Sequence, residues 1–174
     1  MAVELETQRL VLHVPAKADL HAIFDIVSDP ETSRYLGPTP TMQDHFMRFS
    51  RGAGSWLLYG YGNFTVRQKN DPAPIGICGI FHSWRGLGAD FDDLPEAGWI
   101  FSRDNVGKGL GREAMNAVMR WFESEFGPQR IVAMIDHGNA PSLALAAALG
   151  FQIFRDGCLP GSEEPLALME KLPL

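Results

Sequence analysis

The stretch from Tyr59 to Ser102 constrains the fold most, because it holds three extended runs in succession with no helical pattern between them. The runs are YGNFTVRQ, PIGICGIFHS and EAGWIFS, and each is short and rich in aromatic and β-branched residues. The connecting segments KNDPAP and WRGLGADFDDLP carry the glycine, proline and acidic residues that are typical of turns. We therefore predict three consecutive strands of an antiparallel meander.

Further extended and helical patterns lie on both sides of this meander. Before it, TQRLVLHVP alternates like a strand, AKADLHAIFDIVSD has the spacing of an amphipathic helix, and TMQDHFMRFSRGAGSWLL predicts a second helix that its glycines break. After it, GREAMNAVMRWFESEFG is the strongest helix pattern in the chain. RIVAMID, APSLALAAALG, FQIFRDG and PLALMEKL then read as strand, short helix and two final strands. The pattern predicts a single domain over residues 1–174 of the α/β (α+β) class.

Composition and charge exclude several kinds of partner. The 174 residues carry a formal net charge of -6, so the chain offers no basic face of the kind that nucleic-acid binding needs. No apolar run reaches the roughly 18 to 20 residues of a membrane-spanning helix, and the first residues lack the features of a secretory signal. We expect a cytoplasmic protein with no nucleic-acid or membrane partner.

The two cysteines, Cys78 and Cys158, stand far apart and lack the spacing of metal ligands. Free cysteine is among the most buried residue types, so we expect both to be small buried hydrophobic residues. No metal site is predicted.

The segment NVGKGLGREA, residues 105–114, places three glycines and two cations, Lys108 and Arg112, where a helix begins. The first N–H groups of a helix lack intrahelical partners and its dipole is positive there, so a phosphate or pyrophosphate is the natural ligand. A P-loop is excluded because Gly109, and not Ser or Thr, follows Lys108. The dinucleotide fingerprint fits GLGREA, but the polar segment SRDNVGK separates it from the preceding strand. A tight turn without a ligand remains the structural alternative.

A family resemblance rests on this loop and on a second segment. EAGWIFSRDNVGKGLGREAM, followed by HGNAPSLALAAALGF, resembles the acetyl-CoA signature of the GCN5-related N-acetyltransferases (GNAT). It resembles most the branch that modifies N-termini of ribosomal proteins and many small amines, and the N-terminal strand and helix extend the likeness over nearly the whole chain. The resemblance implies the GNAT fold, a mixed and mostly antiparallel sheet of about seven strands flanked by about four helices.

The resemblance also implies which residues hold acetyl-CoA. The glycine-rich turn of the family is matched from Val106 to Gly111, with a departure at Val106, where the family usually has Arg, Gln or an aromatic residue. The strand ending in WIF is expected to splay from RIVAMID and to offer its backbone to the pantetheine arm. The implied binding residues are Phe101, Ser102, Val106, Gly107, Lys108, Gly109, Gly111, Arg112, Asn139 and Ser142.

Two residues are candidates for catalysis. Glu96 matches a position at which related enzymes often carry a carboxylate that accepts the proton of the amine, although a solvated residue at a strand end is an equal alternative. His82 and a water chain are the other candidate bases. Many relatives protonate the departing thiolate with a tyrosine where this chain has Ala146. The ribosomal-protein branch often shows N-x-x-S instead, which Asn139 and Ser142 match, so the resemblance implies that Ser142 faces the CoA sulfur or an adjacent phosphate, with an ordinary helix cap as the alternative.

The acceptor side is expected in the segments 35–60 and 82–96. The acids of the loop GADFDDLPE would steer a cationic amine there, unless they only keep the loop solvated, and Trp84 and Arg85 would line the pocket. These acids are Asp90, Asp92, Asp93 and Glu96.

The predicted function is therefore an acetyl-CoA-dependent N-acetyltransferase acting on a small amine or a peptide N-terminus. The alternative is a CoA-binding or sensing module of the same fold that lacks catalysis. Homodimerisation is left open.

Overall fold

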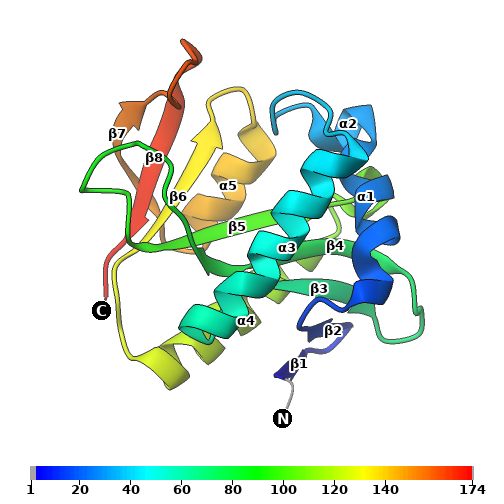
Figure 1. Cartoon of the computed structure of the whole chain (residues 1–174). Coiled ribbons are helices and arrows are strands. Elements are labelled where there is room, and N and C mark those ends of the chain that lie inside the picture. The colour runs from blue at the N-terminus through cyan, green and yellow to red at the C-terminus, as the bar shows by residue number, and fades with distance from the viewer. Residues whose placement is uncertain (1–2, 174) are drawn as a thin grey trace.

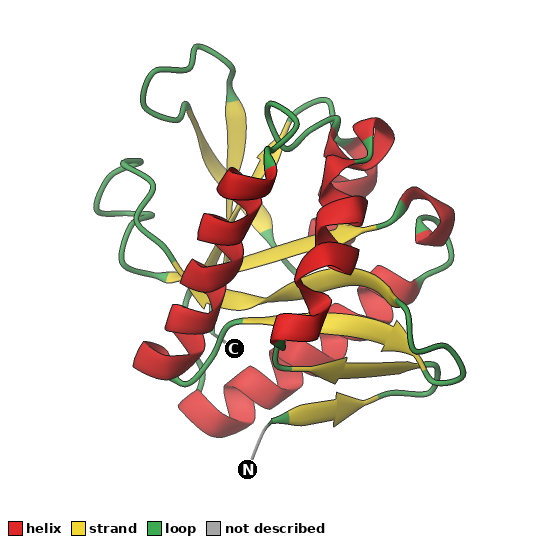
Figure 2. Cartoon of the chain, turned by 45° about the vertical axis from the view of Figure 1, so that its right-hand side comes forward, coloured by secondary structure: helices red, strands yellow, loops and turns green. Residues whose placement is uncertain are grey.

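The computed structural model describes residues 3–173, so positions 1, 2 and 174 of the predicted domain lie outside it. The described chain forms one sheet of eight strands in the order β1-β2-β3-β4-β5-β6-β8-β7. Helices cover both faces of this sheet (Figures 1 and 2). The predicted class, a mixed and mostly antiparallel sheet flanked by helices, is confirmed, with eight strands and five α-helices in place of about seven and four.

The predicted strands and helices follow one another in the predicted order, and a strand at Glu4–Glu6 and a helix at Pro30–Ser33 are additions that were not predicted. The strands are β1 (Glu4–Glu6), β2 (Leu10–His13), β3 (Asn63–Gln68), β4 (Pro74–His82), β5 (Pro95–Phe101), β6 (Ile131–Asp136), β7 (Gln152–Gly157) and β8 (Leu166–Lys171). The α-helices are α1 (Leu20–Ser28), α2 (Pro30–Ser33), α3 (Met42–Tyr59), α4 (Leu110–Phe126) and α5 (Ala140–Ala148). Within residues 3–173, no helix is both long and apolar enough to cross a membrane.

The predicted meander of β3, β4 and β5 is confirmed. β4 and β5 pair antiparallel from Gly76 opposite Phe101 to His82 opposite Pro95. β5 and β6 are parallel and, within the described residues, share only the ladder pair Glu96 with Val132. Beyond that pair the two strands diverge, as Figure 1 shows, and the predicted splay is present.

The second helix differs from its prediction. α3 passes through Gly52 and Gly54 and ends only at Gly60, which has a φ of 77°. Each glycine lowers helix propensity by about 1 kcal/mol. The contacts of the last turns compensate, since Ser55 donates to the Tyr61 carbonyl at 2.8 Å and Trp56 donates to the Asn63 carbonyl at 2.8 Å. These contacts therefore carry α3 past its two glycines, and Gly60, in the left-handed region, caps its end.

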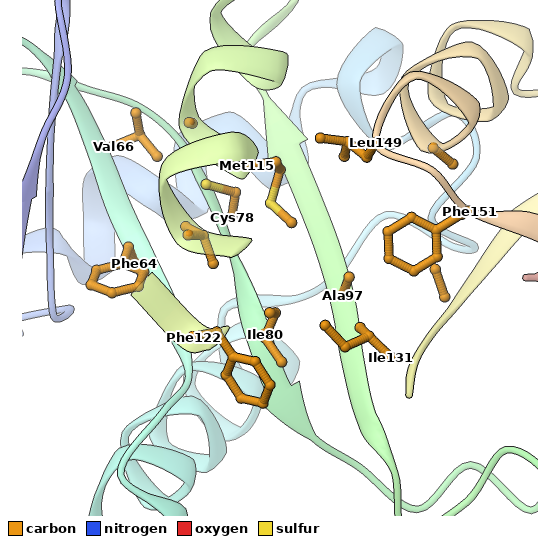
Figure 3. Close-up of a cluster of buried hydrophobic side chains, with 14 of the residues drawn as sticks. Phe64, Val66, Cys78, Ile80, Ala97, Met115, Phe122, Ile131, Leu149 and Phe151 are labelled. Atoms are coloured by element: carbon orange, nitrogen blue, oxygen red, sulfur yellow. The ribbon is translucent and has the colours of Figure 1, made fainter. Parts of the chain in front are cut away.

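Two hydrophobic clusters hold the helices on the sheet. The buried side of α4, which includes Met115 and Phe122, packs on the strands that carry Phe64, Val66 and Ile80, as Figure 3 shows. On the other face, α1 buries Ile23, Ile26 and Val27 against β4 and β5. The sheet therefore separates an α4 side from an α1 and α3 side.

The cysteines differ from each other. Cys78 lies in the α4 cluster, as expected, and burial raises the pKa of its thiol. The prediction for Cys158 is wrong, because this residue is exposed in the loop between β7 and β8.

Replacement of Phe122 by alanine should destabilise the protein by about 3 to 5 kcal/mol, because it leaves a cavity under α4. Phe122 is almost fully buried, and its ring lies 5.0 Å from that of Tyr61 in an edge-on arrangement. Urea unfolding measures the loss. Glu123→Ala, one position along on the exposed side of α4, is the control and should change the unfolding free energy by less than about 0.5 kcal/mol.

Candidate functional site

A cavity of about 200 Å³ opens where β5 and β6 diverge. Three of the predicted site residues, Glu96, Asn139 and Ser142, line it together. The other lining residues come from β3, β4, the loop before β5, β5 itself, the end of β6 and the segment before α3. They are Tyr35, Leu36, Asn63, Ile77, Phe81, Arg85, Ala97, Gly98, Trp99, Ile100, Met134, Ile135 and Asp136.

The backbone of β5 alternates between two partners. Ser102 donates its N–H to the Ile75 carbonyl at 2.9 Å, and the Ser102 carbonyl accepts the N–H of Asn105 at 2.8 Å. Backbone groups in an antiparallel ladder alternate in direction, so Trp99 and Phe101 turn their N–H and C=O groups toward the diverging β6. The expectation for Phe101 is consistent with this geometry. The expectation for Ser102 does not fit it, because both of its backbone groups are already bonded, whereas Trp99 turns its groups toward β6.

The glycine loop leads directly into α4. Gly107 and Gly109 have φ values of 78° and 75°, a region that L side chains rarely adopt, and Gly109 is the N-cap residue of α4 with no side chain capping the helix. Within residues 3–173, no side chain is bonded to the first N–H groups of α4. Lys108 and Arg112 are exposed beside them. This is the arrangement expected of an anion site.

Gly111 has a packing role in the same turn. A Cβ atom at this position would lie 3.3 Å from Leu145 and 3.4 Å from Phe101. The start of α4 therefore approaches both α5 and β5 closely. The purely structural alternative explains this glycine, whereas a Cβ at Gly107 would meet nothing within 4 Å.

Arg9 braces the loop from the N-terminal strands. Its guanidinium donates to the Lys108 carbonyl at 3.1 Å and to Glu113 at 2.6 Å, and Thr7 donates its hydroxyl to the same carboxylate at 2.6 Å. Sequence analysis missed Arg9, because more than 100 residues separate it from Glu113 and no local pattern links them.

Glu96 is a buried residue of an ion pair. Its side chain lies at the sheet surface away from Ala97 and α4, and only 3% of the residue is exposed. The Arg85 guanidinium donates to both carboxylate oxygens, at 2.7 and 2.9 Å, and the Ser83 hydroxyl donates to one of them. The alternative of a solvated strand-end residue is therefore wrong.

His82 is not brought to Glu96. Within the described residues it does not line the cavity. Its Nε2 atom lies 2.7 Å from the Asp93 carboxylate, its Nδ1 atom lies 3.3 Å from the Tyr61 hydroxyl, and its ring stacks on Tyr59 at 4.1 Å. These contacts tie the end of β4 to the loop that follows.

The other acids of that loop are engaged in its own structure. Asp90 forms a two-pronged ion pair with Arg155, both contacts being 2.7 Å, and Asp92 accepts the backbone N–H groups of Arg85 and Gly88. None of the three aspartates lines the cavity within residues 3–173. Of the four predicted acids, only Glu96 faces the cavity.

Of the two residues that we expected to line the acceptor pocket, one lines the cavity and the other does not. Arg85 lies in the cavity wall. Trp84 is 72% exposed and is absent from the wall described above.

The start of α5 contributes Asn139 and Ser142. The Asn139 side chain caps the helix by accepting the Ser142 N–H at 3.2 Å, and the Ser142 hydroxyl oxygen accepts the Trp99 indole N–H at 3.3 Å. Ser142 thus bridges the diverging elements. Ala146 is fully buried, whereas Tyr35 brings a phenol to the cavity from a loop whose sequence had no distinguishing pattern.

No group of three or more His, Cys, Asp or Glu residues that could hold a metal ion occurs within residues 3–173. The expectation of a site without metal stays a prediction.

Comparisons with known proteins agree with this geometry. The family model of the acetyltransferase (GNAT) domain matches residues 9–152. A protein described as a GnaT-family acetyltransferase of Bordetella pertussis has a similar structure, with a TM-score of 0.87 and 30% identity over 97% of this chain and 99% of that one. The uncharacterized N-acetyltransferase p20 of Bacillus licheniformis is 27% identical over 92% of this chain and 87% of its own length.

A more distant structure shares the fold alone. The ribosomal-protein-S5-alanine acetyltransferase of Vibrio fischeri has a TM-score of 0.77 and 18% identity, with 98% of this chain and 97% of that one covered.

Replacement of Glu113 by glutamine should lower stability most at neutral pH. Although desolvation opposes it, the hydrogen bonds from Thr7 and Arg9 and the Arg9 charge hold the pKa of Glu113 below its usual value. A depressed pKa stabilises the fold above the unfolded value of about 4.3, and this contribution is lost as the pH falls through the folded pKa. The difference in unfolding free energy between wild type and Glu113→Gln should therefore be largest near pH 7 and shrink below about pH 4.

Denaturant unfolding between pH 3 and pH 7 measures this difference. The exposed Glu125→Gln serves as the control with the same change of charge on α4. A difference that does not vary with pH would contradict the role given to the Glu113 carboxylate.

Proposed function

Because the chain belongs to the GNAT family of acetyltransferases, we propose that it is an N-acetyltransferase that transfers the acetyl group of acetyl-CoA directly to a primary amine. One observation carries the proposal. The open backbone edge of β5 and a buried carboxylate meet at one cavity, and the uncapped start of α4 packs against Phe101 at the end of the same strand. Direct transfer requires this proximity, because both substrates must be held together in a reactive orientation.

The residues of the glycine loop, of the open edge of β5 and of the cavity wall together fit acetyl-CoA. The free N–H groups at the start of α4, with Lys108 and Arg112, bind the pyrophosphate, and Gly107 and Gly109 let the backbone approach it. Phe101 and the Trp99 carbonyl bond to the pantetheine amides at the open edge of β5. Asn139 provides a further amide at the cavity wall. Val106 contributes only its backbone, so its departure from the family pattern leaves these donors in place.

The chemistry forms a carbon–nitrogen bond and breaks a carbon–sulfur bond. Bound acetyl-CoA supplies the acetyl group as a thioester. Glu96 accepts the proton that the attacking amine loses, and the Ser142 hydroxyl donates a proton to the departing thiolate sulfur. The backbone N–H of Trp99 faces the gap between β5 and β6. It stabilises the negative charge that develops on the thioester oxygen.

The acceptor belongs to the amines on which GNAT proteins act, either a small molecule or a peptide N-terminus. The likeness to a solved acetyltransferase of a ribosomal protein supports the second option only at the level of fold. The small cavity favours the first, since sites for drug-sized ligands measure about 300 to 1,000 Å³.

Replacement of Gly109 by aspartate should weaken acetyl-CoA binding about 100-fold or more. The variant places a side chain at a φ of 75° and a negative charge at the helix start that receives the pyrophosphate. Isothermal titration calorimetry measures the Kd. Gly161→Asp, in the loop before β8 with a φ of 80°, carries the same strain and charge far from α4 and should leave the Kd unchanged.

Replacement of Glu96 by glutamine should lower kcat about 100-fold or more without changing the Kd of acetyl-CoA, because the variant keeps the shape of the side chain and removes its basicity. Release of free thiol in the presence of an amine panel measures kcat. Ser142→Ala, which removes the proposed proton donor, should also lower kcat. A thiol-reactive reagent should confirm that free CoA is the product.

An unchanged kcat and pH profile in Glu96→Gln would contradict the assignment of the base. Acetyl-CoA binding without thiol release from any amine would favour the CoA-binding or sensing module, which the buried Ala146 in place of a tyrosine leaves as the second candidate.

A further inference from the structure

The end of the cavity at Glu96 carries both signs of charge side by side. Arg85 and Glu96 are the charged residues in this part of the wall, and their charged atoms lie 2.7 to 2.9 Å apart. Asp136 also lines the cavity, but it lies four residues along β6 from Val132, the ladder partner of Glu96, which places it roughly 13 Å away. It accepts the Gly138 N–H at 2.6 Å. The acceptor end is therefore a pair of opposite charges and not an acidic pocket.

Arg85 retains hydrogen-bonding capacity. Its Nε and Nη2 atoms donate to Glu96, while its Nη1 atom has no hydrogen-bond partner within the described residues. A guanidinium carries five N–H donors in a rigid fork, so the outer edge formed by Nη1 and Nη2 can bind a second carboxylate in the same two-pronged way. The Glu96 oxygen that faces Nη2 likewise has a lone pair left for an ammonium or amine.

A second cation strengthens the attraction for an anion. Desolvation, followed by repulsion from Arg85 and Arg48, lowers the pKa of Arg51 on α3, and the Glu96 charge acts on it in the opposite sense. Arg51 therefore lies within electrostatic range of the pair while remaining exposed on its outer side. Arg51, Arg85 and Glu96 together leave one positive charge unmatched.

The loop acids do not reverse this balance. Asp90 is neutralised by Arg155, Asp92 is bonded to backbone N–H groups, and Asp93 faces His82. Within residues 3–173, the cavity wall therefore offers a polycationic acceptor no cluster of free carboxylates, contrary to the expectation from the sequence.

We infer that the acceptor is a small amine that carries a carboxylate next to its amino group, such as a free amino acid, with the carboxylate on the outer edge of Arg85 and the amine against Glu96. This inference rests on the proposed acetyl transfer and names its substrate class. The two charges of such a molecule complement the two charges of the pair, and the cavity volume suits its size. Arg51 increases the attraction for the carboxylate.

The test compares matched acceptors with the wild-type protein. The panel holds the common L-amino acids, their carboxamides and their decarboxylated amines, with spermidine and an alanyl peptide as the other acceptor classes. Thiol release gives kcat/KM for each. The preferred amino acid should exceed its own carboxamide and amine by about tenfold or more, because the carboxamide offers the Arg85 edge only one neutral acceptor oxygen and the amine offers none. The carboxamide has the more readily deprotonated amine, so this order cannot come from amine basicity.

A variant then locates the preference. Arg85→Lys keeps the charge beside Glu96 and removes the fork, so the ratio of acid to carboxamide should fall to within about threefold, mainly through KM for the acid. Arg120→Lys, exposed on α4, is the control and should keep the wild-type ratio. Circular dichroism and thermal unfolding verify that both variants fold. The comparison of acceptors with the wild-type protein depends on neither variant.

The outcomes test the substrate class and the acetyltransferase activity separately. Equal rates for acid and carboxamide, or turnover with spermidine or the peptide alone, would overturn the substrate class and leave the transferase standing. An unchanged ratio in Arg85→Lys would also overturn it. No binding of acetyl-CoA in calorimetry would overturn the proposed function itself, whichever acceptor is present.

Discussion

The separation of β5 from β6 after a single ladder pair is the constraint on which the site depends. Neighbouring strands normally consume each other's backbone groups, and a strand in the middle of a sheet has none left over. Here Glu96 and Val132 pair, and the groups of Trp99 and Phe101 that face β6 are left open to a ligand. Most of a sheet's rigidity is kept, because β4 still pairs with β5 along its whole length and β8 with β6. An extended ligand can therefore add to the sheet without unfolding any of it.

Arg85 compensates the buried charge of Glu96, which lies where β5 and β6 begin to diverge. Removing one partner of such a pair typically costs about 3 to 5 kcal/mol, because the other charge stays buried without compensation. Contacts within the loop before β5 keep Arg85 beside Glu96. Asp92 accepts the backbone N–H of Arg85, and Asp90 and Asp93 fix the loop to Arg155 and His82. The loop acids, which the sequence suggested would attract a cationic amine, thus help to hold Arg85 in place.

Local patterns predict much of this fold. The aromatic and β-branched runs of β3 to β5 and the apolar face of α4 are properties of residues close in the chain, and a single sequence contains that information. The common cavity of Glu96, Asn139 and Ser142 followed from the family resemblance. Long-range pairs could not be predicted, since nothing near Glu96 specifies Arg85, and nothing near Glu113 specifies Arg9. The error at Ser102 has the same origin, because the direction of a backbone N–H depends on the partner strand's register.

The sheet also partitions the two halves of the site. Ala97 points toward α4, and its neighbour Glu96 points to the opposite surface, so the glycine loop and the charged pair are reached from different sides of one layer. Neither substrate has to leave before the other arrives. Cys78 lies beneath α4 and does not line the cavity within residues 3–173. The architecture therefore favours a sequential kinetic scheme in which both substrates are bound at once, with the sheet as the wall through which they meet.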